Sequence, residues 1–154
     1  MKIVSFNTAA WNTTVERIKK HFGTLETWLD RHAVDILCLQ ETKISKEDLE
    51  MNALKLGALN EKYDTFWAYM QLGSQQKKGL NGVATFSRKG RTVKATAQIF
   101  QESVLDSEGR CIMTDHGNFV IFNVYVPFSG VNYGRLAFKM KLLKSLRIAM
   151  HKQR

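Results

Sequence analysis

Residues 35–43 read Asp35-Ile36-Leu37-Cys38-Leu39-Gln40-Glu41-Thr42-Lys43, a short apolar run that ends abruptly in Gln40 and Glu41. An apolar run of this length between polar residues is typical of a buried strand. In α/β enzymes the carboxyl ends of such strands place ligand-binding and catalytic side chains at the edge of the sheet. The run therefore predicts an α/β fold and makes Glu41 a candidate functional carboxylate.

Two further segments change from apolar to polar in the same way. Residues 2–7 end in Asn7, and residues 119–126 carry Asn123 and Tyr125 near their end. Strand alternation places Asn123 and Tyr125 on one face, opposite the intervening valines. For one strand alone, exit into solvent is the simpler interpretation. Three strands that supply an amide, a carboxylate and a phenol together indicate a site.

The composition is that of an ordinary globular domain. The chain has 154 residues, of which 44% are hydrophobic and 24% charged, which argues against disordered, collagenous and membrane classes. No apolar run reaches the roughly 18 residues that a membrane span needs, and Met1 leads directly into a strand without a signal-peptide pattern. We therefore expect a soluble, intracellular protein. Cys38 and Cys111 are expected to be buried core residues, neither zinc ligands nor a disulfide.

Positive charge is concentrated in the second half of the chain. Residues 1–77 hold 10 Lys and Arg against 10 Asp and Glu, whereas residues 78–154 hold 13 against 4, so the second half carries the whole net charge of +9. This asymmetry favours a polyanionic partner. Seven basic residues and no acidic one follow from Arg135 onward, on a predicted amphipathic helix. Such a helix could bind a membrane or a partner, but packing against its own sheet is favoured.

Periodicity and turn signals predict the remaining elements. Helices are expected over residues 13–31 with a break at Gly23, over 45–57 and over 132–150, with capping boxes at Thr13–Glu16 and Ser45–Asp48. Strands are expected over residues 63–69, 81–87, 92–99, 110–114 and 118–126. The order βαβα, then a run of strands, then a helix predicts one compact unit with a mixed sheet and flanking helices.

Two linkers bear on function. The segment with Lys77, Lys78 and Asn81 is suited to laying backbone amides and ammonium groups along phosphates. The pair Asp115-His116 suggests a general base and its orienter. Its setting between two strong strands, followed by Gly-Asn, predicts a tight hairpin turn instead.

The residue types at the strand ends indicate a class of chemistry. Asn7 and Glu41 offer hard oxygen ligands without His or Cys beside them, which suits Mg²⁺ or Mn²⁺ held largely by water and substrate phosphate. The phenol of Tyr125 is able to hold or polarise a phosphate oxygen. Together with the basic second half, these groups predict metal-assisted phosphodiester hydrolysis.

Several motifs occur in the order and spacing of the endonuclease/exonuclease/phosphatase superfamily. They are Ile3–Asn7, Asp35–Lys43, Gly79–Arg88, Glu108–Arg110 and Asn123–Pro127. The chain resembles the exonuclease III and AP endonuclease branch of this superfamily. The runs Glu108–Ile112 and Arg135–Met140 and the Asp-His-Gly turn are most similar to the type-2 AP endonucleases of eukaryotes.

This resemblance implies a fold, an activity and a set of roles. Residues 1–154 are expected to form the amino-terminal part of a four-layer α/β sandwich. The family activity is Mg²⁺-dependent DNA repair, by cleavage of double-stranded DNA beside abasic sites or at blocked 3′ ends, nuclear if the source is a eukaryote. By position, Asn7 and Glu41 are expected at the metal and Tyr125 at the scissile phosphate. The expected DNA contacts are Lys43, Lys77, Lys78, Asn81, Arg110 and Arg135.

The chain also departs from the family pattern. Common polar or aromatic residues of the family near the metal or the DNA are replaced here by Ala9, the pair Leu80-Asn81 and Phe128. The strength of phosphate binding and the substrate preference are therefore expected to differ. The sequence ends at Arg154, before the Gly-Asp-x-Asn and Ser-Asp-His motifs of the second half of the family domain. We therefore expect the isolated chain to be inactive. It is also expected to expose an apolar sheet face or to dimerise through it.

Two other functions are open from the sequence. A phosphoesterase of the same superfamily that acts on a lipid or inositol phosphate would prefer a soluble phosphoester over duplex DNA. A non-catalytic DNA-binding fragment would bind without metal, and its binding would weaken steeply with salt.

Overall fold

The computed structural model describes residues 1–71 and 80–153. Lys77 and Lys78, two of the predicted DNA contacts, lie outside these residues. The strands are β1 (Ile3–Asn7), β2 (Ile36–Gln40), β3 (Tyr63–Ala68), β4 (Val83–Arg88), β5 (Lys94–Thr96), β6 (Cys111–Asp115) and β7 (Val120–Val124). The helices are α1 (Trp11–Phe22), α2 (Leu25–Arg31), α3 (Lys46–Asn52), α4 (Ser103–Asp106) and α5 (Leu136–His151).

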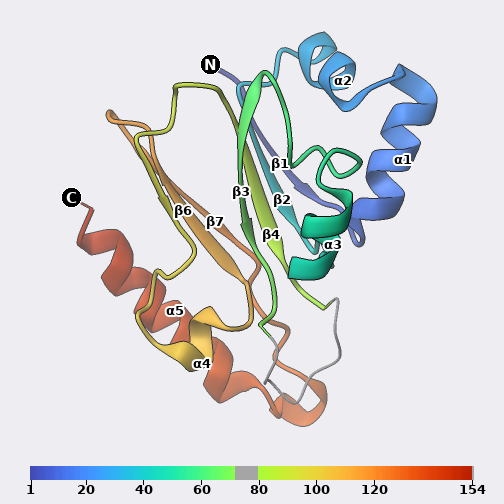
Figure 1. The fold of residues 1–154 in the computed structure, drawn as a ribbon. Helices are drawn as coiled ribbons and strands as arrows, with labels where there is room; N and C mark the ends of the chain where they lie inside the picture. The colour runs from blue at the N-terminus through green and yellow to red at the C-terminus, as the bar shows by residue number, and fades with distance from the viewer. Residues whose placement is uncertain (72–79, 154) are drawn as a thin grey trace.

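The strands form two sheets that pack face to face. The first has the order β1-β2-β4-β3, with β1 and β2 parallel and the other pairs antiparallel, and the second is the antiparallel sheet β5-β6-β7. Helices α1, α2 and α3 lie on the outer side of the first sheet, and α4 and α5 lie on the outer side of the second (Figure 1). The described residues thus form helix, sheet, sheet and helix layers, which confirms the predicted α/β class.

The main core lies between the first sheet and its helices. Trp11 and Leu29 are fully buried there against Phe86 of β4, and the Trp11 and Phe86 rings lie 5.9 Å apart. The Trp11 indole N–H donates to the Leu56 carbonyl at 2.8 Å, so its polar atom is satisfied inside the core. This packing anchors the amino end of α1.

The capping predictions have different outcomes. Ser45 and Asp48 form the expected capping box of α3. The box predicted at Thr13–Glu16 is wrong, because the N-cap of α1 is Ala10, three residues before Thr13, and it makes no side-chain cap. The Trp11 amide donates to the Thr42 carbonyl at 2.9 Å, so burial of Trp11 and this contact set the start of the helix.

Other elements differ from the prediction mainly in length. The predicted strand over residues 92–99 shortens to β5, and the four-residue helix α4 had no sequence signal. The last helix begins at Leu136, because Val131–Tyr133 form a separate 3₁₀ turn. The hairpin expected after Asp115 is present, with the His116 amide donating to the Phe119 carbonyl at 2.9 Å. No helix within the described residues is long and apolar enough to span a bilayer.

Candidate active site

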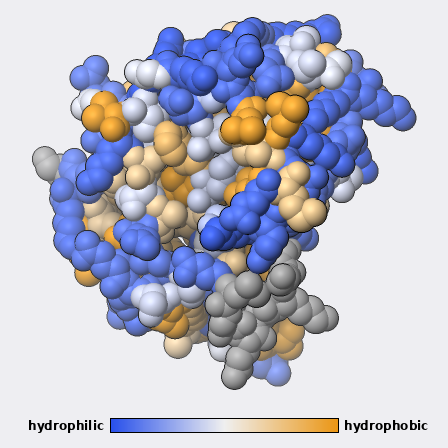
Figure 2. Space-filling model, viewed as in Figure 1, coloured by the Kyte–Doolittle hydropathy of each residue, from blue (hydrophilic) through white to orange (hydrophobic). Residues whose placement is uncertain are grey.

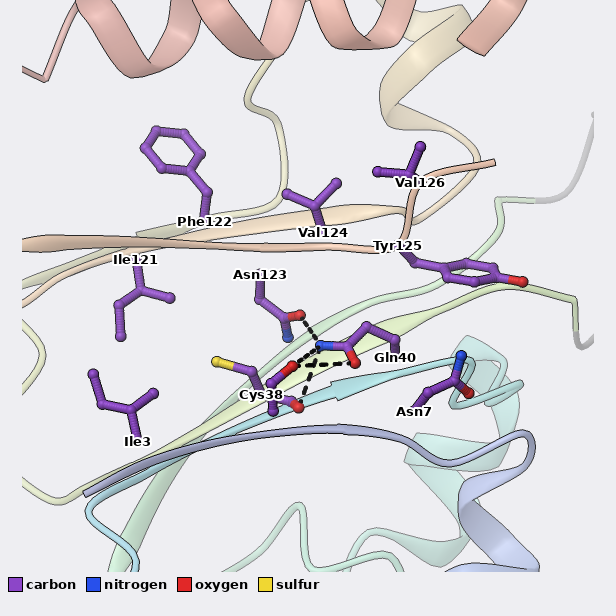
Figure 3. A pocket seen from close by; sticks show the side chains of 11 residues that line it. Ile3, Asn7, Cys38, Gln40, Ile121, Phe122, Asn123, Val124, Tyr125 and Val126 are labelled. Carbon is purple, nitrogen blue, oxygen red and sulfur yellow. Dashed lines mark hydrogen bonds between the residues drawn. The ribbon is translucent and has the colours of Figure 1, made fainter. Parts of the chain in front are cut away.

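Three strand ends meet at one end of the two sheets. Asn7 ends β1, Glu41 directly follows β2, and Tyr125 directly follows β7. The Asn7 Nδ2 donates to the Glu41 Oε1 at 2.8 Å. Figure 3 shows Ile121 and Asn123 pointing from β7 toward the first sheet, with the Tyr125 ring at the same end of the pocket as Asn7. The predicted face of this strand is therefore correct.

The loops after β1 and β2 are fastened to each other. Parallel pairing places Asn7 opposite Gln40, and the next amide, that of Thr8, donates to the Gln40 carbonyl at 2.9 Å. The Thr8 hydroxyl also lies 3.0 Å from the Glu41 carbonyl and 3.1 Å from that of Gln40. Because Thr8 is buried, these contacts fix the backbone that carries the Glu41 side chain.

The backbone around Glu41 adopts a conformation that side chains disfavour. Ala9, Glu41 and Lys43 have φ values of 55°, 52° and 54°, in the left-handed region. Such residues cost of order 1 kcal/mol each and cluster at functional sites. Nearby Gly82 also has a positive φ, and a Cβ there would lie 2.4 Å from the Thr42 hydroxyl oxygen, so only glycine fits.

The phenol of Tyr125 lies between a carboxylate and a guanidinium. Burial raises the pKa of Tyr125 above its ordinary value, and the neighbouring Glu41 carboxylate raises it further, while Arg110 lowers it in part. The Arg110 guanidinium carbon lies 5.1 Å from the centre of the Tyr125 ring. Tyr125 is therefore protonated at neutral pH and able to donate a hydrogen bond to an anionic oxygen.

A buried ion-pair triad lies behind this phenol. The Glu108 carboxylate accepts from the guanidinium groups of both Arg110 and Arg135. Arg110 is only 5% exposed, so its guanidinium faces the protein. The structure thus gives Arg110 a supporting position under Tyr125, where a contact to DNA backbone had been predicted. The Arg135 side chain is 31% exposed and retains a surface for such a contact.

Two predicted DNA contacts lie at the same end of the sheets. The exposed residue Lys43 donates its amide to the Asn81 carbonyl at 2.9 Å. The Asn81 side-chain amide lies 3.4 Å from the Glu108 carbonyl. Together with Arg135, which pairs with Glu108, these residues form one polar surface beside the three strand ends.

Asn123 joins the two sheets behind the site. It is 2% exposed and accepts from the Gln40 amide at 2.8 Å (Figure 3). It also donates to the Ala84 carbonyl at 2.8 Å. Gln40 precedes Glu41 and Asn123 lies two residues before Tyr125, so this bridge fixes the site residues of the two sheets relative to each other. An amide on the inward face of an apolar strand was the sequence signal for it.

Glu41 has no protein cation to neutralise its charge within the described part of the chain. None of the ion pairs among residues 1–71 and 80–153 involves it. In the same residues no three His, Cys, Asp or Glu side chains lie close enough to hold an ion together. The oxygen ligands present are the Glu41 carboxylate and the Asn7 Oδ1, which accepts from the Ala9 amide at 3.1 Å, and both are hard ligands.

The site opens onto an uncovered side of the molecule. β1 and β7 are edge strands of their sheets, and a cavity of about 560 Å³ lies between them, with Ile3 and Ile121 among its apolar residues. Ile3 and Phe6 on β1 are 46% and 39% exposed. Figure 2 shows the molecule from the side of Figure 1, where hydrophobic surface is also visible in the hollow between the two sheets.

Curated proteins that are similar to this chain have names that refer to DNA. The chain is 28% identical over 159 residues to DNA-(apurinic or apyrimidinic site) endonuclease 2 of Xenopus laevis, covering 82% of this chain and 28% of that protein. It is 29% identical over 146 residues to an exodeoxyribonuclease of Bacillus subtilis (strain 168), covering 95% and 50%. It is 32% identical over 139 residues to the DNA repair nuclease APEX1 of Danio rerio, covering 90% and 40%. The chain thus spans half or less of the length of these relatives.

Solved structures share the fold. An AP endonuclease from Leishmania major superposes with a TM-score of 0.75 at 24% identity, covering 97% of this chain and 47% of that chain. The catalytic domain of Xenopus laevis APE2 gives a TM-score of 0.71 at 24% identity, covering 95% and 52%. The model of the Endonuclease/Exonuclease/phosphatase family matches residues 4–150. The predicted family is therefore confirmed, and this chain belongs to the Endonuclease/Exonuclease/phosphatase family.

Proposed function

We propose that this chain supplies one side of a metal-dependent site that hydrolyses DNA phosphodiester bonds beside abasic positions and at 3′ ends. The observation that carries the proposal is the convergence of Glu41, Asn7 and Tyr125 at one sheet end, with no protein cation paired to Glu41 in the described residues. An unpaired carboxylate beside a proton-donating phenol suits a substrate that is itself an anion bound with a cation.

The donors fit Mg²⁺ or Mn²⁺. Mg²⁺ keeps several waters and needs only one or two protein carboxylates when substrate phosphates complete its shell, which matches a site with Glu41 and Asn7. These two residues would hold the ion, and the ion would stabilise negative charge on the phosphate oxygens. Softer ions prefer His and Cys ligands, and the described residues contain no group of three His, Cys, Asp or Glu side chains that could hold such an ion.

The protein groups have separate roles in this proposal. Tyr125, kept protonated by its raised pKa, donates to a non-bridging oxygen of the scissile phosphate. Arg110 and Glu108 hold the phenol in place from behind. Lys43, Asn81 and Arg135 contact the DNA backbone, and Lys77 and Lys78 remain predicted contacts of the same kind. Three relatives named as DNA endonucleases, exonucleases or repair nucleases support DNA as the polyanion.

The test is metal-dependent binding of a short duplex with a tetrahydrofuran abasic analogue, measured by fluorescence anisotropy. We expect Mg²⁺ to tighten binding by wild type and to leave binding by Glu41→Gln unchanged, while Lys43→Ala weakens binding with and without Mg²⁺. Competition by inositol hexakisphosphate stronger than that by unlabelled duplex would favour the phosphoesterase alternative. Binding that persists equally in EDTA and falls with salt would identify a non-catalytic DNA-binding unit.

We further propose that this chain by itself does not turn over substrate. Hydrolysis needs a base to activate the attacking water, and the histidines of the described residues are placed elsewhere. His32 and His116 bond Trp28 and Arg91, and His21 and His151 lie on α1 and α5. Incubation with an abasic duplex and Mg²⁺ should give no nicking above that of Glu41→Ala. Turnover that this substitution abolishes would refute the proposal.

We also propose that the uncovered β1 and β7 edges associate with further polypeptide, as another copy of this chain or another protein segment. Edge strands with exposed apolar residues favour such pairing. Light scattering during size exclusion is expected to show a dimer at high concentration, weakened by Phe6→Lys. A monomer at all concentrations would count against self-association.

A further inference from the structure

The loop between β7 and α5 presents three large hydrophobic side chains to solvent. Phe128, Val131 and Tyr133 are 76%, 82% and 74% exposed, all within six residues. Single exposed hydrophobic residues are common on protein surfaces, whereas a group of them indicates an interaction site. In Figure 1 this loop protrudes at the lower end of the molecule, before α5 begins.

The loop is closed on itself by backbone hydrogen bonds. The Arg135 amide donates to the Ser129 carbonyl at 2.7 Å, and the Tyr133 amide donates to the Gly130 carbonyl at 3.3 Å. Gly130 has a φ of 84°, and a Cβ added there would lie 3.2 Å from the Arg135 nitrogen. Asn132 also adopts a left-handed conformation inside the turn. The exposed side chains therefore stand on a compact turn with a defined backbone.

The base of the loop is connected to the proposed catalytic phenol. Arg135, where the loop ends, pairs with Glu108, and Glu108 also binds Arg110. The Arg110 guanidinium in turn lies against the ring of Tyr125. Because Glu108 and Arg110 are both 5% exposed, this chain of contacts holds the loop at a fixed place relative to Tyr125.

The charge around the loop indicates what it contacts. Residues 116–154 contain no Asp or Glu, and their seven Lys and Arg lie from Arg135 onward, where the loop leads into α5, so an apolar partner that is also anionic fits best. Nucleobases combine a flat apolar face with a phosphate backbone, and their stacking on aromatic rings contributes about 1–3 kcal/mol per base. A base opposite an abasic position has no pairing partner and costs less to unstack than a paired base, and a base at an end already has an open face.

We propose that Phe128 and Tyr133 stack on an unpaired nucleobase beside the phosphate held at Tyr125, and so favour abasic or end-containing DNA over intact duplex. This inference rests on the proposed DNA function and adds to it a group that distinguishes substrates. Phosphate contacts alone do not separate damaged from intact DNA.

The experiment uses two duplexes of one sequence, one intact and one with a tetrahydrofuran analogue opposite 2-aminopurine, in the presence of Ca²⁺. Anisotropy measures binding, and 2-aminopurine fluorescence reports stacking. Wild type should quench 2-aminopurine. Phe128→Ala combined with Tyr133→Ala should abolish the quench and weaken binding of the abasic duplex about tenfold. The same double variant should bind the intact duplex within about twofold of the wild-type affinity. Tyr133→Trp should retain the quench, and Met51→Ala, another exposed hydrophobic residue on α3, should behave as wild type.

The outcomes separate this inference from the proposed function. Equal quench and equal affinities for wild type and the double variant would overturn stacking while leaving DNA binding intact. An equal loss on both duplexes would also overturn it, because the loop would then be a general contact. No binding of either duplex by wild type would refute the proposed function, and this inference with it.

Discussion

Strand β2 carries a carboxylate at each end, and the two have opposite surroundings. Asp35 precedes the strand and accepts from the Lys2 amide at 2.7 Å and from the Arg91 guanidinium at 2.9 Å, with Arg88 3.5 Å away. Glu41 follows the strand and contacts an amide and a phenol, with no protein cation paired to it in the described residues. The first charge is neutralised by the fold, whereas the second has no protein cation beside it in the described residues, as the proposed metal site requires.

Left-handed backbone conformations are also more frequent near Glu41 than near Asp35. Ala9, Glu41 and Lys43, in the loops directly after β1 and β2, have positive φ, and so does Asn81, whose carbonyl accepts from the Lys43 amide. Near Asp35, Ala33 has a positive φ. A carboxylate that protein cations neutralise is a structural group, whereas an unpaired one among several strained residues indicates a site.

The largest expected effect concerns Glu108, a carboxylate that is neutralised like Asp35 but more deeply buried. Glu108→Ala leaves the Arg110 guanidinium buried without its partner, which should lower the free energy of unfolding by about 3 kcal/mol. Urea denaturation measures this change. Glu50→Ala, which removes an exposed partner of Lys46, should leave the midpoint unchanged. A small effect of Glu108→Ala would mean that neutralised carboxylates here are not structural.

A smaller effect is expected at Asp35. Asp35→Asn should lower the free energy of unfolding by about 1 kcal/mol at neutral pH, because partly exposed charge pairs contribute modestly. The Lys2 amide, and then the charges of Arg91 and the amino terminus, hold the pKa of Asp35 below its ordinary value.

The sign of the pH dependence follows from that lowered pKa. The stabilisation by Asp35 is present above its unfolded pKa, near 3.9, and is lost as pH falls through the lower folded value. Asp35→Asn should therefore lose less stability than wild type between neutral pH and pH 3, as measured by urea denaturation at each pH. Parallel pH curves for the two proteins would contradict this assignment.

The smallest effect is a shift in the titration of Tyr125. Because the Glu41 carboxylate contributes to the raised pKa of Tyr125, Glu41→Gln should lower that pKa toward its ordinary value of about 10. Absorbance of the phenolate, taken as the difference from Tyr125→Phe in each background, measures it. Asp35→Asn serves as the control and should leave the titration of Tyr125 unchanged. An unchanged pKa of Tyr125 in Glu41→Gln would show that the Glu41 carboxylate does not act on the Tyr125 phenol.

The sequence predicted those parts of the structure that depend on local pattern. Alternation placed Tyr125 and Asn123 on the inward face of β7, and the apolar run ending in Glu41 is indeed a buried strand. The start of α1 was not predictable from capping signals, because burial of Trp11 sets it through long-range contacts.

Other features of the site depend on contacts between distant segments. The family resemblance predicted a DNA contact for Arg110, but its pairing with Glu108 inside the protein is a result of tertiary packing. The left-handed conformations of Ala9, Glu41 and Lys43 had no signal in residue type, since none of these residues favours that region. The backbone conformation of these loops is therefore not predictable from the residue types alone.

The most direct test of the account is Mn²⁺ binding by the protein alone, followed by electron paramagnetic resonance of the free ion. Wild type and Asp35→Asn should bind Mn²⁺ with similar affinity. Glu41→Gln should bind at least about tenfold more weakly, because it removes the one charged oxygen ligand of the proposed site. Equal binding by Glu41→Gln and wild type, or an equal loss in Asp35→Asn, would contradict the claim that Glu41, unlike Asp35, keeps its charge for an external cation.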